Sequence, residues 1–189
     1  MQGVRSEQQA QRRARVVAAA MALAAKGGYD AVQMRAVSQE ADVALGTIYR
    51  YFSSKDQLLL AGLDQLATDM AEELEKERPA GGPVERVSEV FRRSCALLEG
   101  EPLMAHAVVT ALSTSDPEVA KHSHGVQDTL KSMIAGALDG EAIDDIDDVV
   151  HVLGQVWFAS LLAWVSGRAG EGSMAADLDL ATTLLLKNR

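Results

Sequence analysis

Cysteine, proline and aromatic residues are all scarce in this sequence. Its 189 residues include one Cys, four Pro, three Phe, two Trp and three Tyr. A single cysteine excludes an internal disulfide and fits a reducing cytosol. Scarce proline and little β-strand alternation favour an all-α fold. No apolar run reaches the roughly 20 residues that cross a membrane, and no signal-peptide pattern begins the chain, so a cytoplasmic protein is expected.

Charge is divided unevenly along the chain, although the total is acidic at −9. Residues 1–60 hold eight of the 18 Lys and Arg residues and five of the 27 Asp and Glu residues, a net charge of +3. Residues 61–189 hold the other 10 basic and 22 acidic residues, a net charge of −12. Neutralising phosphate requires positive charge, so the N-terminal third is the part suited to nucleic acid.

Apolar residues recur at three- and four-residue steps through most of the chain, as in helices that pack on a core. Gly27 and Gly28 end the first such stretch, and the Pro-Ala-Gly-Gly-Pro segment at 79–83 is a clear loop. Asp116 and Pro117 provide an N-cap and a first-turn proline. Helices are expected at about 8–26, 34–41, 45–52, 55–78, 84–99, 102–113, 117–138, 143–167 and 174–187.

Two short predicted helices, 34–41 and 45–52, are separated by a tight turn. Val43 is expected to be buried between them, and Ile48 and Phe52, four residues apart, are expected to face the core. The opposite face of the second helix is left with four polar or aromatic side chains, Thr47, Tyr49, Arg50 and Tyr51. A helix-turn-helix of this size can enter the major groove of DNA.

Residues 41–58 read Ala-Asp-Val-Ala-Leu-Gly-Thr-Ile-Tyr-Arg-Tyr-Phe-Ser-Ser-Lys-Asp-Gln-Leu. In order and spacing this segment resembles the TetR family of one-component transcriptional regulators. The resemblance implies an N-terminal three-helix DNA-binding domain at 1–54 and a C-terminal helical domain for ligand binding and dimerisation at 55–189. It further implies a ligand-responsive regulator, expected to be a repressor, that binds a double-stranded DNA operator.

Three residues depart from the family pattern. Asp42 stands where a turn glycine is usual, although Asp tolerates the left-handed backbone conformation better than most residues. Ala44 and Gln33 stand where a Ser and a Thr usually cap the two helices. These departures put the two caps, and the phosphate contact of residue 33, in doubt.

By its position in the family pattern, Arg35 is predicted to reach a guanine edge, where an arginine can bond to two acceptors at once. Lys55, in the first turn of the following helix, is predicted to pair with a phosphate. The residues predicted to contact DNA are Arg12, Arg13, Arg35, Gly46, Thr47, Tyr49, Arg50, Tyr51 and Lys55. Two alternatives stay open: Tyr51 packs on the core, and Arg12, Arg13 and Arg15 form a solvated surface.

The C-terminal body of a TetR-like protein encloses a small molecule whose binding changes the separation of two DNA-reading heads. Residues 26–37, 156–164 and 178–181 resemble the repressors of sterol (cholesterol) catabolism within the family. The implied effector is a sterol-derived acid or its coenzyme A thioester. Methionine and tryptophan suit an adaptable apolar cavity. The predicted lining is Met70, Phe91, Cys95, Met104, Val108, Met133, Trp157, Leu161 and Trp164. The alternative is that these residues are ordinary core.

The predicted helices at 143–167 and 174–187 are unusually apolar for the end of a chain. Two such helices can form half of a four-helix bundle with a twofold mate. A homodimer through these two helices is predicted, because a helix-turn-helix gains by reading two half-sites. The alternative is that the two helices complete the core of a monomer.

An enzyme is the main competing interpretation. The sequence has no Gly-x-Ser-x-Gly elbow, phosphate loop or dinucleotide fingerprint, so no catalytic residue, metal or cofactor is expected. A second alternative is a helical small-molecule-binding or interaction protein with no DNA role. The division of charge between the two parts of the chain argues against it.

Overall fold

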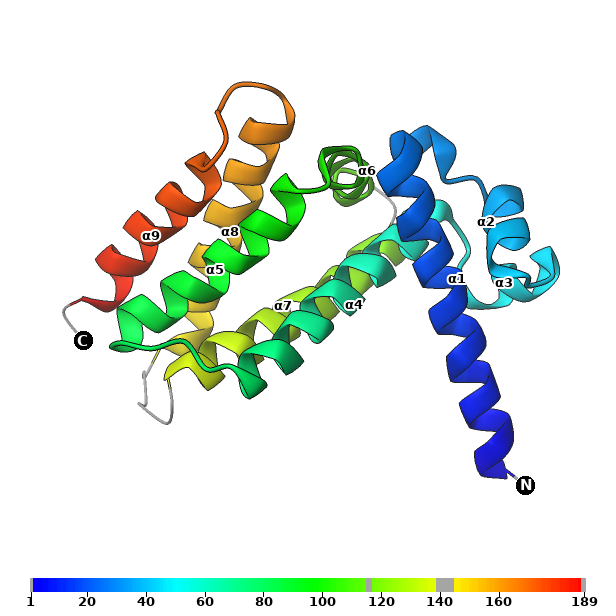
Figure 1. The fold of residues 1–189 in the computed structure, drawn as a ribbon, viewed down its shortest axis with the longest axis horizontal. Coiled ribbons are helices and arrows are strands. Elements are labelled where there is room, and N and C mark those ends of the chain that lie inside the picture. The colour runs from blue at the N-terminus through cyan, green and yellow to red at the C-terminus, as the bar shows by residue number, and fades with distance from the viewer. Residues whose placement is uncertain (1, 115–116, 139–144, 188–189) are drawn as a thin grey trace. The chain divides into compact units, whose positions relative to one another are not determined.

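The computed structural model describes residues 2–114, 117–138 and 145–187, and it does not describe the side chains of residues 2–6 and 117–127. The described residues form helices and connecting turns, without a β-strand, which confirms the all-α fold (Figure 1). The helices are α1 (Gln2–Ala31), α2 (Met34–Ala41), α3 (Leu45–Tyr51), α4 (Lys55–Lys76), α5 (Pro83–Glu99), α6 (Pro102–Leu112), α7 (Pro117–Leu138), α8 (Ile146–Val165) and α9 (Ser173–Leu186). Within the described residues the boundaries agree closely with the predicted ranges, except for α1, which is longer at both ends. The predicted N-cap Asp116 and residues 143–144 of the predicted helix 143–167 lie outside the described residues.

The chain divides into two compact units. Unit 1 comprises Met1–Leu63 and Glu101–Ser123, and unit 2 comprises Asp64–Gly100 and His124–Arg189. α4 and α7 therefore contribute residues to both units, and α6 folds with the N-terminal helices rather than with α5. The predicted functional division between residues 54 and 55 stays a prediction, because compactness does not identify which residues bind DNA or ligand.

In unit 1, α1 packs mainly on α6 and α2. Val16, Ala20 and Ala24 are fully buried at four-residue steps, so one stripe of α1 faces the core. The facing helix α6 is also rich in small buried side chains, namely Ala105, Ala107, Val108 and Ala111. Small residues on both helices allow their backbones to approach closely, and this explains why α6 belongs to unit 1.

The helical backbone of α1 is kinked at two glycines near its end. Gly27 has non-helical dihedral angles, and Gly28 has a φ of +67°, a conformation that glycine adopts without steric cost. The chain then forms one more turn, which carries Tyr29. The predicted stop at these glycines is thus a kink, after which the helix continues to Ala31.

α2 and α3 form the predicted helix-turn-helix, with residues in the predicted roles. Asp42 lies in the turn with a φ and ψ of 50°, the left-handed conformation anticipated for the position of the usual glycine. Val43, Ile48 and Phe52 are buried. The core beneath the turn is therefore built from the apolar positions that the sequence predicted.

Two hydrogen bonds, which involve the two serines that precede α4, cap its start. The backbone N–H of Gln57 donates to Ser54 Oγ at 3.2 Å, and the backbone N–H of Ser53 donates to Gln57 Oε1 at 2.9 Å. This reciprocal pair satisfies donors that have no partner within the first turn of a helix. The connection between α3 and α4 is three residues long, and these hydrogen bonds hold it in place.

In unit 2, α9 packs on both α5 and α8 (Figure 1). The core between them contains leucines that are fully or almost fully buried, namely Leu98, Leu153, Leu161 and Leu178. Two polar links join α9 and its preceding turn to α5: the N–H of Gly172 donates to Glu99 Oε1 at 2.9 Å, and Arg92 Nε donates to Asp179 Oδ2 at 3.3 Å.

α8 is the most apolar long helix of the described chain. Its length and apolar composition would allow it to cross a membrane, and core helices of soluble proteins share these properties. Only 28% of the apolar window is buried within the single chain. Much of this helix is therefore left uncovered by the rest of the protomer.

Candidate functional site

The outer face of α3 presents polar and aromatic groups to solvent. Ile48 is fully buried on the inner face, whereas the side chain of Tyr49 is 52% exposed and Arg50 is exposed. Gly46 is exposed, and a Cβ atom added to it would meet no atom within 4 Å. Thr47 is half-buried beside it. A partner surface can therefore come into contact with the backbone of α3 at Gly46.

Arg35 lies in the first turn of α2 and is exposed. The N-cap residues of α2 and α3, Gln33 and Ala44, make no side-chain capping hydrogen bond. Their departures from the family pattern therefore do remove the two side-chain caps.

Two other residues predicted to contact DNA have aromatic partners inside the protein. The guanidinium carbon of Arg13 lies 5.2 Å from the centroid of the Phe52 ring. The half-buried Tyr51 ring lies 6.4 Å from the same ring, centroid to centroid, and is tilted by 60°. Arg12 and Arg13 are both exposed at the surface of α1. The DNA-contact roles of all three residues stay predictions.

Lys55 has two intramolecular contacts, both to a residue that the sequence did not single out. Its Nζ donates to the backbone carbonyl of Tyr29 at 3.1 Å and lies 3.5 Å from the centroid of the Tyr29 ring. The Tyr29 hydroxyl donates to Asp56 Oδ1 at 2.6 Å. Burial, followed by this hydrogen bond and the negative charge of Asp56, raises the pKa of Tyr29 to about 12.

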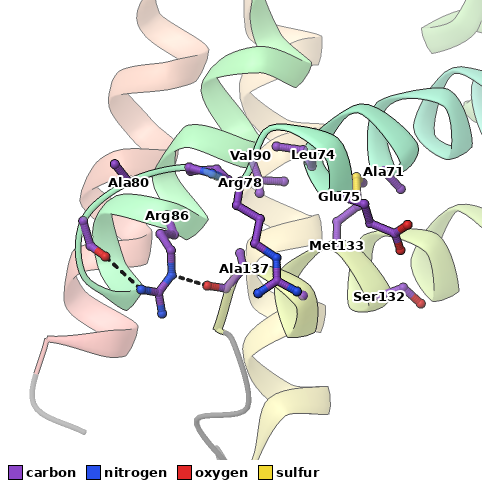
Figure 2. Close-up of a pocket in the computed structure, with 13 residues that line it drawn as sticks. Ala71, Leu74, Glu75, Arg78, Ala80, Arg86, Val90, Ser132, Met133 and Ala137 are labelled. Carbon is purple, nitrogen blue, oxygen red and sulfur yellow. Dashed lines mark hydrogen bonds between the residues drawn. The ribbon is translucent and has the colours of Figure 1, made fainter.

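Unit 2 contains a cavity of about 420 Å³ (Figure 2). It lies among the second half of α4, the α4–α5 connection, α5 and the end of α7. The lining residues are Ala71, Leu74, Glu75, Arg78, Pro79, Ala80, Gly81, Arg86, Val90, Ser132, Met133, Gly136 and Ala137. The volume is within the range of small-molecule sites, and the lining combines apolar side chains with a few charged groups.

Arg86 ties together two segments that border the cavity. Its Nη1 donates to the carbonyl of Gly81 at 2.8 Å, its Nη2 donates to the carbonyl of Leu138 at 3.3 Å, and its Nε donates to the carbonyl of Ala137. The last two acceptors are terminal carbonyls of α7, which have no partner within their helix. Figure 2 shows Arg78 reaching across the cavity from the α4–α5 connection toward α7.

The nine residues predicted to line one ligand site lie in several different places in the structure. Met133 lines the cavity of unit 2. Met70, Phe91, Cys95 and Leu161 are buried in unit 2 outside the lining of that cavity. The remaining four are the half-buried Trp157 and Trp164 on α8, and Met104 and Val108, which belong to α6 in unit 1.

Sequence reasoning missed most of the lining of this cavity. The two arginines are charged, and Gly136 and Ala137 are small, so none of them fits a search for Met and Trp at helical spacing. The available signal was the Pro-Ala-Gly-Gly-Pro loop, because acidic and basic residues flank it on both sides, at 75–78 and at 85–86.

Cys95 is buried on α5, and it is a candidate neither for a disulfide nor for a metal site in the described chain. Burial, followed by the negative charges of Glu99 and Asp179, raises the pKa of its thiol to about 12. A thiol with so high a pKa is a poor nucleophile, because the thiolate is the reactive form.

An apolar surface covers α8 and α9. Its large side chains are exposed to fractions of 41% for Val152, 36% for Leu162, 62% for Leu180 and 73% for Leu184. Single exposed apolar side chains are common on monomers, but these three leucines and one valine lie on two helices that already pack together.

Two family models match the chain. The model described as "Bacterial regulatory proteins, tetR family" matches residues 16–61, and the model described as "Tetracyclin repressor-like, C-terminal domain" matches residues 81–185. The HTH-type transcriptional repressor KstR of Mycolicibacterium smegmatis is 38% identical over 183 residues, which cover 96% of this chain and 90% of that protein. KstR of Rhodococcus jostii is 36% identical over 182 residues, which cover 96% of this chain and 85% of that protein.

Solved structures share the fold over nearly the whole chain. A TetR transcriptional regulator from Rhodococcus sp. RHA1 has a TM-score of 0.87 at 28% identity, covering 96% of this chain and 98% of that one. FadR of Thermus thermophilus, a TetR family repressor solved in complex with lauroyl-CoA, has a TM-score of 0.73 at 24% identity, covering 92% of this chain and 93% of that one.

Proposed function

Because the chain belongs to the tetR family of bacterial regulatory proteins, we propose that it represses genes of sterol or lipid catabolism in response to a small apolar acid. It is a ligand-responsive DNA-binding transcriptional regulator and not an enzyme. The family expected from residues 41–58 is thereby confirmed. The resemblance of residues 26–37 to sterol-catabolism repressors supports the narrower proposal about pathway.

The DNA surface is proposed to be the exposed face of α3 together with the first turn of α2. The observation that carries this proposal is the contrast between the fully buried Ile48 and its exposed neighbours Tyr49 and Arg50, within the segment that matches the tetR family model. Arg35 suits a base edge, because its planar fork can bond to two acceptors of guanine. Gly46 suits close approach to the sugar–phosphate backbone, because no side chain covers it.

Binding to a random-sequence duplex across a salt series tests the DNA role itself. A protein that neutralises phosphates loses affinity linearly on a logarithmic salt scale, with a slope of about −0.9 for each phosphate contacted. We expect such a slope, followed by tighter binding to duplexes selected from a random pool. A helical interaction protein with no DNA role would show no salt-dependent association, and that result would remove the proposal.

The effector is proposed to occupy the cavity of unit 2. Leu74, Val90 and Met133 offer an apolar wall, and Arg78 can offer a charge-assisted hydrogen bond to an acidic group. A sterol-derived acid or its coenzyme A thioester fits this combination. Lauroyl-CoA, which is bound in the structure of FadR of Thermus thermophilus, is an acyl thioester of coenzyme A.

Thermal melting with a panel of sterol acids, fatty acids and their coenzyme A thioesters tests the effector proposal. At least one compound is expected to raise the melting temperature, because a ligand that binds only the folded state stabilises it. Arg78→Gln should lower the affinity for that compound by about tenfold, because one charge-assisted hydrogen bond is lost. Arg168→Gln, at an exposed position outside the cavity, is the matched control. No shift with any acid would overturn the proposal.

The helix α4 is proposed to carry the effect of the ligand to the DNA surface. Its residues Lys55–Leu63 belong to unit 1, and its residues Asp64–Lys76 belong to unit 2 and include the cavity residue Leu74. A ligand that fits one position of this helix better than another shifts the population of DNA-competent dimers. A tenfold change in operator affinity needs about 1.4 kcal/mol of such coupling.

Members of the family dimerise, and the interface of this chain is proposed to lie on α8 and α9. The exposed apolar side chains of Leu180 and Leu184, and the 28% burial of the apolar window of α8, support this assignment. Two apolar helices from each protomer can form a four-helix bundle with an apolar centre. The dimer would then carry two helix-turn-helix units, each of which can bind one half-site of the operator.

A further inference from the structure

We propose that Tyr29 is a positioning residue of the DNA-binding unit, which holds the first turn of α4 in place by binding Lys55 and Asp56 together. The inference rests on the proposed DNA-binding role of α3. It assigns a role to a residue that lies outside α2 and α3 and that is not itself proposed to touch DNA.

Three polar contacts converge on Tyr29 from the two adjacent residues of α4. The Lys55 ammonium meets both the carbonyl oxygen of Tyr29, at 3.1 Å, and the centre of its ring, at 3.5 Å. The hydroxyl at the far end of the same ring donates to Asp56 at 2.6 Å. Contacts at both ends of a rigid ring restrict rotation as well as translation of the helix turn that supplies them.

The chemistry of these contacts suits a fixed joint. A cation over an aromatic face is attracted by the ring quadrupole, and the attraction grows when both groups are partly shielded from water. The carbonyl of Tyr29 also accepts from the N–H of Val32 at 3.3 Å, so Lys55 completes the second acceptor site of a group at a helix end. Gly28, with its φ of +67°, turns the chain immediately before Tyr29.

The joint is close to the DNA surface along the chain. α3 ends at Tyr51, and only Phe52, Ser53 and Ser54 separate it from Lys55. Phe52 is buried, and both serines take part in the cap of α4. A displacement of the first turn of α4 is therefore passed to α3 through three residues with little freedom. Tyr29 thus sets the position of the helix that is proposed to enter the groove.

A double-mutant cycle tests this inference, with the duplex selected from the random pool used as the operator in every affinity measurement. Tyr29→Leu and Lys55→Met are each expected to weaken operator binding by about tenfold, the effect of losing a partly shielded cation–π contact. The double variant should lose operator affinity by about the same factor as each single variant, because the effects of substituting two residues in direct contact are not additive in free energy. Tyr29→Phe, which keeps the ring and loses the hydroxyl, should be weakened less than Tyr29→Leu. All affinities are measured well below the melting temperature of each variant, so that partial unfolding does not contribute.

The control cycle pairs Lys55→Met with Tyr49→Leu. Tyr49 is another tyrosine of the same unit, but its ring is exposed on α3, so the two losses should multiply to about a hundredfold. The salt dependence of Tyr29→Leu should equal that of the wild type, because no cation is removed.

Three results would overturn the inference while leaving the proposed DNA role intact. The first is an unchanged operator affinity in Tyr29→Leu, and the second is a loss of affinity in the double variant equal to the product of the two single losses. The third is a salt slope that is smaller in magnitude by about 1.8 in Tyr29→Leu, which would mean that Tyr29 only holds Lys55 of each protomer on a phosphate. A wild-type protein that binds no duplex would instead remove the proposed function.

Discussion

The hydroxyl of Ser38 donates to the carbonyl of Val43 at 2.7 Å, so the last turn of α2 is bonded to the residue that leads into α3. The backbone N–H of Val43 returns a hydrogen bond to the carbonyl of Ser38 at 3.2 Å. This reciprocal pair closes the turn of the helix-turn-helix around Asp42, whose left-handed backbone the two bonds enclose. These local contacts, together with the packing of both helices on α1, hold α2 and α3 at their angle.

The left-handed conformation of Asp42 predicts that Asp42→Gly stabilises the protein. A non-glycine residue in this conformation costs about 1–2 kcal/mol, and the greater unfolded-state freedom of glycine offsets about 0.5–1 kcal/mol of the relief. The free energy of unfolding, measured by urea titration, should therefore rise by about 0.5–1 kcal/mol.

Asp128→Gly is the matched control for that change, because Asp128 is exposed within the right-handed helix α7. It should lower the free energy of unfolding by about 0.5–1 kcal/mol. A lower stability of Asp42→Gly would mean that the side chain of Asp42 makes a stabilising contact that outweighs its backbone strain.

Tyr49→Ala should weaken operator binding without unfolding the protein. Its ring is 52% exposed, so truncation removes little packing and should change the free energy of unfolding by less than about 0.5 kcal/mol. Loss of an aromatic contact at a DNA interface should lower operator affinity about tenfold or more, measured by fluorescence anisotropy. Tyr51→Ala is the contrast, because its half-buried ring packs beside Phe52 and its loss should lower stability. Wild-type affinity in Tyr49→Ala would exclude this residue from the interface.

Leu184→Glu should convert the dimer into a monomer. The leucine is 73% exposed in the single chain, and a buried charge without a partner would strongly oppose an apolar interface. Sedimentation velocity measures the change in mass. Leu103→Glu, at a position that is 50% exposed on α6 in unit 1, should remain dimeric. A dimeric Leu184→Glu protein would place the interface elsewhere.

Cys95 should resist alkylation in the folded protein. Its pKa is raised to about 12 by burial and then by nearby carboxylates, so at pH 8 both access and thiolate are lacking. Mass spectrometry after maleimide treatment should find one adduct only when denaturant is present. A Cys95→Ala/Ala96→Cys variant moves the thiol to the exposed neighbouring position and should react in the folded state. Rapid labelling of Cys95 in the folded protein would contradict this prediction.

Tyr29 should contribute stability that depends on pH in the alkaline range. Its folded-state pKa is raised to about 12 from an ordinary value of 10.0, so the neutral phenol is favoured by folding. This contribution is fully present below pH 10 and is lost as the pH rises toward 12. The difference in urea midpoint between the wild type and Tyr29→Phe should be constant below pH 10 and shrink above it. A difference that is independent of pH would contradict the hydrogen bond to Asp56.

Much of the fold follows from patterns that are local in the sequence. The buried Val43, Ile48 and Phe52 and the left-handed Asp42 were all predicted, because each depends on residues within one or two turns of each other. The kink of α1 was predicted as a stop. A glycine pair signals a break in helical bonding, but whether the chain resumes a helix depends on the core that the next turn can reach.

By itself, the sequence determined the helices, the helix-turn-helix and the family, since helical spacing and turn chemistry are properties of neighbouring residues. Tertiary structure alone decided the partners of Lys55, the placement of α6 with α1, and a cavity bordered by Arg86 rather than by the predicted tryptophans. Lys55 and Tyr29 are 26 residues apart, and Arg86 and Ala137 are 51 apart. Such pairs meet only when several helices pack at once, and no periodicity within a single helix specifies that packing.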